Sequence, residues 1–435
     1  MTTESAPVPP TTSVVEKISG SVPRSRLSAG SVVSSLRDYG LLLALIAIML
    51  FFQVTTDGTL FKPVNLTNLV LQNSFIIIMA LGMLMVIVAG HIDLSVGSVA
   101  GFIGALGAMM MCTWPVGPFL SNPLVASIVC LLVGAAIGAI QGYWIAYHRI
   151  PSFIVTLAGM LVFRGLNQAL LGGLSIGPFP VEFQLLSTGF IPDVIGPLTI
   201  VPPTVNAAHK VIVGSGIVLH STTMVIGILG VLAYIYFGIR GRQIRDRHGY
   251  DSEPLLLFVL KTAITSALAL FLTYSFATYK GLPNVLIVMG LLIGIFIFIT
   301  KQTTIGRRVY AMGGNVKAAQ LSGIDTNRLT LIVFTNMGVL SALGGLIIAA
   351  RLNMAVPAAG QGAELDVIAA VFIGGASAMG GVGQVAGAVI GAFIMGVMNN
   401  GMSINGLSVD WQQVVKGLVL LGAVVFDVYN KRNKA

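Results

Sequence analysis

Six ionisable side chains lie inside or beside long apolar stretches of this sequence, and they are its first candidates for chemistry: Asp93, Arg164, Lys261, Glu364, Asp366 and Lys416. At the centre of a membrane-spanning helix such a charge costs about 2.5–3.5 kcal/mol. By default, groups of this kind therefore face a cavity or a partner. We expect Asp93, in Asp93-Leu94-Ser95-Val96-Gly97, to cap a helix N-terminus in preference to touching a substrate.

Glu364 and Asp366 allow two interpretations. They could lie in the outer headgroup layer beside Arg351, where a charge costs little, or they could line a translocation path. We prefer the headgroup layer.

Motifs for catalysis, nucleotide binding and metal binding are missing from the sequence. It contains no Gly-x-x-x-x-Gly-Lys-Ser/Thr, no His-Glu-x-x-His and no Cys-x-x-Cys. The chain therefore cannot bind ATP through a P-loop, and its 5 histidines are too scattered for a metal site. Its 2 cysteines do not indicate a disulfide framework. We expect no enzyme activity and no cofactor in this chain.

The composition demands a lipid environment. Hydrophobic residues make up 55% of the chain and charged residues 9%, with a mean hydropathy of +0.92. Soluble domains carry about 25% charged residues. Helices are the expected spanning form, because hydrocarbon offers backbone groups no water to bond. The net charge of +9 is not gathered into one patch, so nucleic-acid binding is not expected. The sequence predicts an all-α polytopic membrane protein.

Hydropathy predicts about 12 transmembrane helices, with a range of 10–12, since about 20 apolar residues cross a bilayer. Two stretches, 69–112 and 364–379, are open to a broken or re-entrant interpretation. The predicted spans are 39–56, 69–90, 93–112, 124–147, 151–171, 221–239, 254–276, 283–300, 328–350, 364–379, 384–400 and 411–427.

The loop charges orient these spans. If the N-terminus is inside, the outer segments hold only 4 of the 24 basic residues, namely Lys62, Lys210, Lys280 and Arg351. Three more, Arg164, Lys261 and Lys416, fall within spans, which leaves 17 inside. This excess is what the positive-inside rule demands. Both termini are therefore predicted to be cytoplasmic.

The chain divides into a tail and one membrane domain. Residues 1–37 are polar and predicted to be a disordered cytoplasmic tail, and 38–430 form the transmembrane domain. Its long loops are 172–220 outside and 301–327 inside. In the inner loop we expect Asn315 to cap a short helix over 316–322 that Gly323 ends.

Glycines recur at helical spacing in two strips. We expect both strips to serve ordinary packing within the bundle in preference to a contact between subunits. They are Gly134-xxx-Gly138-xxx-Gly142 and Gly383-xxx-Gly387-xxx-Gly391.

Several runs together resemble one family. Gly90-His91-Ile92-Asp93-Leu94-Ser95-Val96-Gly97-Ser98 is similar to the Gly-x-Ile-Asp-Leu-Ser-Val-Gly signature of permeases from ribose- and xylose-type ABC importers. The resemblance extends in order over about 39–430 and is closest to the xylose, or multiple-monosaccharide, branch. Its further runs are Pro151 to Leu157 with Arg164-Gly165, Tyr310 to Asn315 with Ala318-Ala319 and Ser322 to Ile324, Ala363 to Ala370, Gly374 to Ser377 with Gly380-Gly381, and Asn399 to Met402.

The resemblance implies a type II-like ABC importer permease for a pentose or hexose in the bacterial inner membrane. Its implied partners are a second permease copy, an ABC ATPase subunit inside that uses the ATP, an extracytoplasmic sugar-binding protein that selects the sugar, and membrane lipid. Residues 221–276 would be an added helical pair, and 301–327 the coupling segment. The ATPase contacts would be Gly313, Gly314, Asn315, Ala318, Ala319, Ser322 and Gly323.

Candidates for the translocation path are Asp93, Arg164, Arg351, Glu364, Asp366 and Asn400. The alternative function is an ion-coupled secondary transporter, for which Asp93, Glu364 and Asp366 would supply the ion site.

Overall fold

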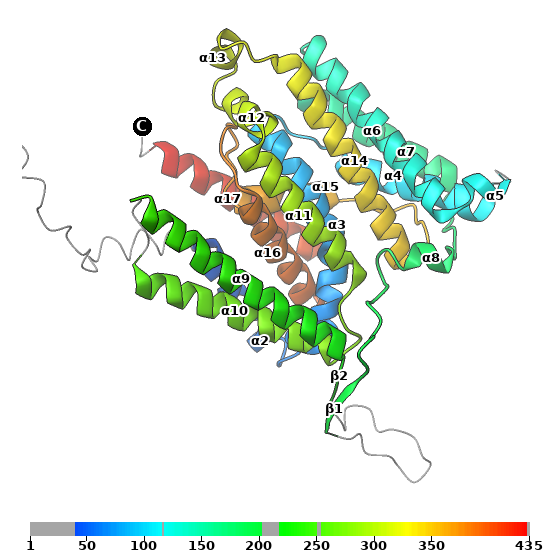
Figure 1. Ribbon diagram of the computed structural model, residues 1–435. Coiled ribbons are helices and arrows are strands. Elements are labelled where there is room, and N and C mark those ends of the chain that lie inside the picture. The colour runs from blue at the N-terminus through cyan, green and yellow to red at the C-terminus, as the bar shows by residue number, and fades with distance from the viewer. Residues whose placement is uncertain (1–39, 115–116, 202–216, 250–253, 433–435) are drawn as a thin grey trace, which may run out of the picture.

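The computed structural model of the chain describes residues 40–114, 117–201, 217–249 and 254–432. Within these ranges the protein is a bundle of long helices with one small antiparallel hairpin, β1 (Leu198–Val201) and β2 (Ile217–Leu219) (Figure 1). In the described part, 9 helices are long and apolar enough to cross a membrane. The predicted all-α polytopic class is confirmed. The predicted tail, 1–37, lies outside the described residues.

Each predicted span overlaps one helix. The helices are α2 (Gly40–Thr55), α3 (Pro63–Val88), α4 (Val96–Ala108) with the π-helical turn η2 (Met109–Thr113), α5 (Gly117–Leu120), α6 (Pro123–Tyr147), α7 (Ser152–Leu171), α8 (Val181–Gln184), α9 (Ser221–Arg247), α10 (Leu255–Ala277), α11 (Asn284–Gln302), α12 (Thr304–Gly314), α13 (Val316–Leu321), α14 (Thr326–Leu352), α15 (Ala363–Ile373), α16 (Val385–Ile404) and α17 (Val409–Arg432). At 1.5 Å per residue α15 is only about 16 Å long, too short to cross the hydrocarbon alone. The number of 12 crossings therefore stays a prediction.

Helices α3 and α14 form the centre of the bundle. Both are buried along most of their length, with Ile77, Leu81, Phe334 and Met337 fully enclosed. Helix α6 lies against α14 so closely that a Cβ on Gly138 would meet the carbonyl of Phe334.

The second glycine strip packs in the same way, on α15. Cβ atoms on Gly387 and Gly391 would meet the carbonyls of Gly374 and Ala370. Both strips thus serve packing within the chain, as predicted.

Two breaks interrupt the helices and meet each other. The first lies between α3 and α4, where Gly90 has a φ of +85°. The second follows α15 and includes Gly380 and Gly381, at φ values of +81° and +73°. The Gly381 amide donates to the carbonyl of Val88 at 2.8 Å. The two breaks are therefore packed against each other at Val88 and Gly381.

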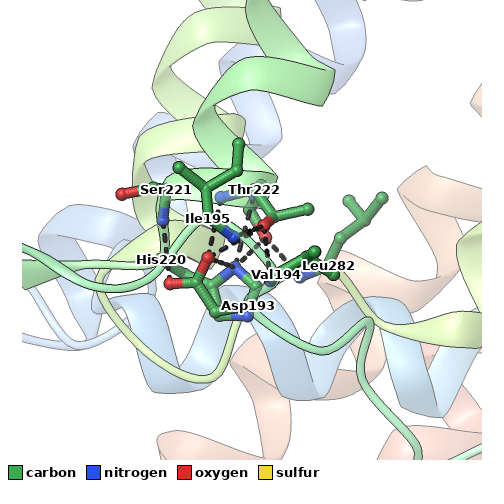
Figure 2. Close-up of polar contacts among 8 residues, drawn as sticks. Asp193, Val194, Ile195, His220, Ser221, Thr222 and Leu282 are labelled. Atoms are coloured by element: carbon green, nitrogen blue, oxygen red, sulfur yellow. Dashed lines mark hydrogen bonds and ion pairs between the residues drawn. The ribbon is translucent and has the colours of Figure 1, made fainter.

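On the side of the molecule that carries β1 and β2, one carboxylate joins the loop after α8 to α9. The Asp193 carboxylate accepts hydrogen bonds from the amides of Ser221 and Thr222 at 3.1 and 3.0 Å and from the Thr222 hydroxyl at 2.8 Å (Figure 2). The His220 ring lies 3.9 Å from the same carboxylate. From this junction α9 runs back beside α10 at one edge of the bundle (Figure 1).

Candidate functional site

The segment between α11 and α14 forms two short helices at one end of the bundle. The Asn315 side chain accepts from the Ala318 amide at 3.0 Å and so caps α13. Gly323 follows the helix with a φ of +79°. The predicted short helix, its cap and its end are confirmed. Helix α12 was not predicted, although Thr303 caps it by accepting from the Gly306 amide at 3.2 Å.

Most of the residues expected to contact an ATPase lie on the open side of these helices. Gly314, Asn315, Ala318, Ser322 and Gly323 are exposed. Two apolar side chains lie among them, Val316 and Leu321, which are 47% and 91% exposed.

Ala319 and Gly313 differ from the other expected contacts. The Ala319 side chain is only 4% exposed and packs in the main core, because it is on the face of α13 that turns toward the bundle. It is therefore not part of the exposed face. Gly313 is held against the backbone of Val88 and Gly381, and a Cβ there would lie 2.7 Å from the Gly381 nitrogen.

A hollow of about 580 Å³ opens beside α12 and α13. Its lining includes Gly313, Val316 and Gln320 from this segment and Arg149 from the turn between α6 and α7. Met379, from the break after α15, lines it too. The hollow therefore joins the α12–α13 segment to the two helix breaks.

A second pocket, of about 600 Å³, lies among α3, α7, α15 and α17. It brings together two ion pairs. Lys416 Nζ lies 3.0 Å from Asp366 Oδ2, and an Arg164 guanidinium nitrogen lies 3.8 Å from Glu364 Oε1. Asn399 donates to the same Asp366 oxygen at 3.0 Å. We call this the charged pocket.

The charged pocket shows how its two carboxylates are buried and which cations they face. Glu364 and Asp366 are each 6% exposed, so both are buried within the chain. Their ion-pair partners are Arg164 and Lys416, where Arg351 had been expected. The expectation that Arg351 lies beside these carboxylates was therefore wrong, whereas their depth in the membrane stays a prediction. The sequence places Lys416 inside a predicted span but does not indicate that it pairs with Asp366.

The other candidates for the path lie elsewhere. Asn400 exchanges two side-chain hydrogen bonds with Asn65, at 2.9 and 3.1 Å, and so joins α16 to α3. Arg351 is in the last turn of α14.

Asp93 is buried just before α4. It accepts from the amide and hydroxyl of Ser95 at 2.8 and 2.7 Å. The helix begins at Val96 with Ser95 as its N-cap residue, so the prediction that Asp93 itself caps this helix was wrong in position. The carboxylate instead holds the residue that precedes the first turn.

The arrangement defines a class of protein. A polytopic bundle with polar hollows beside its central helices is typical of membrane transport proteins. Within the described residues, no three of His, Cys, Asp and Glu lie together as a metal site would need.

Comparison with known proteins agrees with that class. The family of branched-chain amino acid transport system permease components matches residues 65–192 and 200–424. The chain belongs to this family. Permease components are transport proteins and not enzymes. No solved structure was found to match the chain.

Its similar relatives are sugar permeases. The xylose transport system permease protein of Escherichia coli K12 is 39% identical over 413 residues, which cover 94% of this chain and 96% of that protein. The corresponding protein of Haemophilus influenzae is 37% identical over 399 residues, covering 92% and 98%. The ribose import permease protein of Escherichia coli K12 is 34% identical over 386 residues, covering 88% and 92%.

Proposed function

We propose that this chain is the membrane-spanning permease subunit of a bacterial inner-membrane ABC importer for a monosaccharide, with xylose as the first candidate. The observation that carries the proposal is the likeness to xylose and ribose permeases along nearly the whole of both chains. The sequence has no P-loop, so energy from ATP can enter only through another protein.

An ATPase subunit is proposed to dock on α12 and α13 from the cytoplasm. Leu321 is 91% exposed and Val316 47% exposed, and apolar side chains left bare outside lipid are typical of a protein interface. The exposed small residues around them let a partner approach closely. The basic residues of 301–327 support the cytoplasmic orientation.

The charged pocket is proposed to line the sugar's path. Its two carboxylates and two cations leave no net charge, which suits a neutral, polyhydroxylated substrate. An ion-coupled carrier would need a free carboxylate to bind the proton or sodium ion. Glu364 and Asp366 are each already paired with a cation, which disfavours that alternative. A second copy of the chain would complete the pore. An extracytoplasmic binding protein would deliver the sugar and select it.

Transport in proteoliposomes tests this proposal. The chain alone, given a proton or sodium gradient, should accumulate neither xylose nor ribose. Adding the binding protein outside and the ATPase subunit with ATP inside should start accumulation, and a protonophore should not stop it. Gradient-driven uptake by the isolated chain would establish the carrier alternative in its place.

A further inference from the structure

The break after α15 forms a hydrogen-bonded turn at the surface of the hollow beside α12 and α13. The Ser377 amide donates to the Val382 carbonyl at 2.9 Å, and the Gly380 amide donates to the Ser377 carbonyl at 3.0 Å. Gly380 and Gly381 supply the left-handed conformations that the turn needs. These hydrogen bonds close residues 377–382 into a turn, and we call them the 377–382 turn.

This turn is fastened to the proposed coupling segment. A Cβ on Gly381 would lie 2.8 Å from the Gly314 backbone, so the two backbones touch. Just beyond the turn, the Tyr310 hydroxyl of α12 donates to the Gly383 carbonyl at 2.8 Å. The turn and α12 thus form one continuous surface.

The tip of the turn is apolar and open. Met379 is 76% exposed and Val382 54% exposed, and the turn contains no charged residue. Met379 lines the same hollow as Val316 and Gln320 of α13. A flexible methionine side chain adapts well to a partner's surface.

We propose that the 377–382 turn is a second part of the docking face for the cytoplasmic ATPase subunit. The proposal rests on the proposed function, which assigns that partner to α12 and α13. The turn and the α12–α13 segment line the same hollow. A protein bound to Val316 and Leu321 would therefore also cover Met379, and for this reason we assign the turn to the ATPase subunit. Through residues 374–376 the turn leads directly into α15. An ATPase bound there holds the inner end of the element that carries Glu364 and Asp366.

Site-directed crosslinking in the full transporter complex tests the proposal. Cysteine is placed at Met379, at Leu321 or at His248, after Cys112 and Cys130 have been replaced. His248 is the matched control, exposed and at the end of α9 on the same predicted side of the membrane. A short reagent that couples to the cysteine thiol and carries a photoreactive group is attached, and the products formed on illumination are identified by mass spectrometry. We expect Met379→Cys and Leu321→Cys to crosslink to a P-loop ATPase, and His248→Cys not to do so.

The outcomes separate this inference from the proposed function. Crosslinking from Leu321→Cys without crosslinking from Met379→Cys would overturn the second contact and leave the ATPase assignment standing. If neither Leu321→Cys nor Met379→Cys crosslinked to the ATPase, both the second contact and the ATPase assignment would be overturned. Crosslinking of Met379→Cys to a second copy of this chain, or to lipid alone, would replace the ATPase as the occupant.

A substitution measures the strength of the contact. Met379→Glu puts a charge into an interface that has to exclude water, so the ATPase retained per permease should fall about tenfold, the size of an interface residue worth 1.4 kcal/mol. The permease should still insert in the membrane, because the side chain is exposed in the free protein. Unchanged ATPase retention would contradict the proposal.

Discussion

Removing the ammonium group from the charged pocket should destabilise the fold, because it leaves a buried carboxylate without its counter-charge. In Lys416→Met, Asp366 would keep only the hydrogen bond from Asn399. The carboxylate side chain is 9% exposed and the lysine side chain 23% exposed. Breaking a buried ion pair from one side costs about 3–5 kcal/mol. The partial exposure of Lys416 and the adjoining pocket, which can admit water, place this pair at the lower end of that range.

We therefore expect Lys416→Met to lower the free energy of unfolding by about 3 kcal/mol, somewhat more than a hundredfold in the equilibrium constant. The assay is unfolding by sodium dodecyl sulfate in mixed micelles, followed by circular dichroism of the helices. Lys416→Arg, which keeps the positive charge, is the matched control and should lose less.

A double-mutant cycle then isolates the pair. Asp366→Asn combined with Lys416→Met removes both charges, so the double variant should be more stable than the sum of the two single losses predicts. Additive losses would show that the 3.0 Å contact contributes nothing. If Lys416→Met lowered the free energy of unfolding by less than about 1 kcal/mol, the pair would behave like an exposed surface pair, and its assignment as a buried ion pair would be wrong.

Two further predictions follow from single contacts, and a third follows from the predicted topology. Gly313→Ala should reduce the amount of folded permease in the membrane, because the added Cβ would meet the backbone of Val88 and Gly381. Gly314→Ala is the control and should not reduce it, because a Cβ at Gly314 would have nothing within 4 Å. Equal amounts of the two variants would contradict the close packing at Gly313. Partial burial raises the pKa of Asp193, but the hydrogen bonds from Thr222 and Ser221 and the nearby His220 outweigh it, so the pKa is lowered. The hydrogen bonds that join Asp193 to the start of α9 are therefore fully formed above the ordinary pKa of 3.8 and are lost as pH falls through the lowered pKa. Protease cleavage of the loop 172–220, which is predicted to lie outside, should rise over that pH range in the wild type. Asp193→Asn should show no such step with pH. With both native cysteines replaced, an impermeant thiol reagent should label Val194→Cys, at a position that is 81% exposed, in intact cells and should spare His248→Cys; the reverse pattern would invert the topology.

The helices could be predicted because lipid imposes a simple rule on the sequence. A segment that faces hydrocarbon must be apolar over its length, so spans such as α6 and α11 can be located from composition alone. The cap at Asn315 was predictable for a similar reason, since a side-chain oxygen before a helix satisfies backbone amides within the same few residues. Such features depend on neighbours in the chain.

The partners of the charged residues could not be predicted in this way. Lys416 and Asp366 are 50 positions apart, and Arg164 is far from Glu364 in the chain. Their pairing depends on how α7, α15 and α17 pack around the pocket, which no local pattern records. The headgroup interpretation paired the acidic residues with Arg351, the nearest basic residue in sequence, whereas the fold supplies cations from other helices.

Helix α12 was missed because its sequence contains Gly306, Gly313 and Gly314, residues that weaken an isolated helix. The structure gives these glycines another use. Gly306 and Gly313 lie where a Cβ would meet backbone, against Thr300 and Val88, so α12 is seated directly on its neighbours. A helix so placed cannot shift without moving the backbone that it touches. In a segment proposed to dock an ATPase, the glycines of α12 thus lower helix propensity but permit direct contact with the neighbouring backbone.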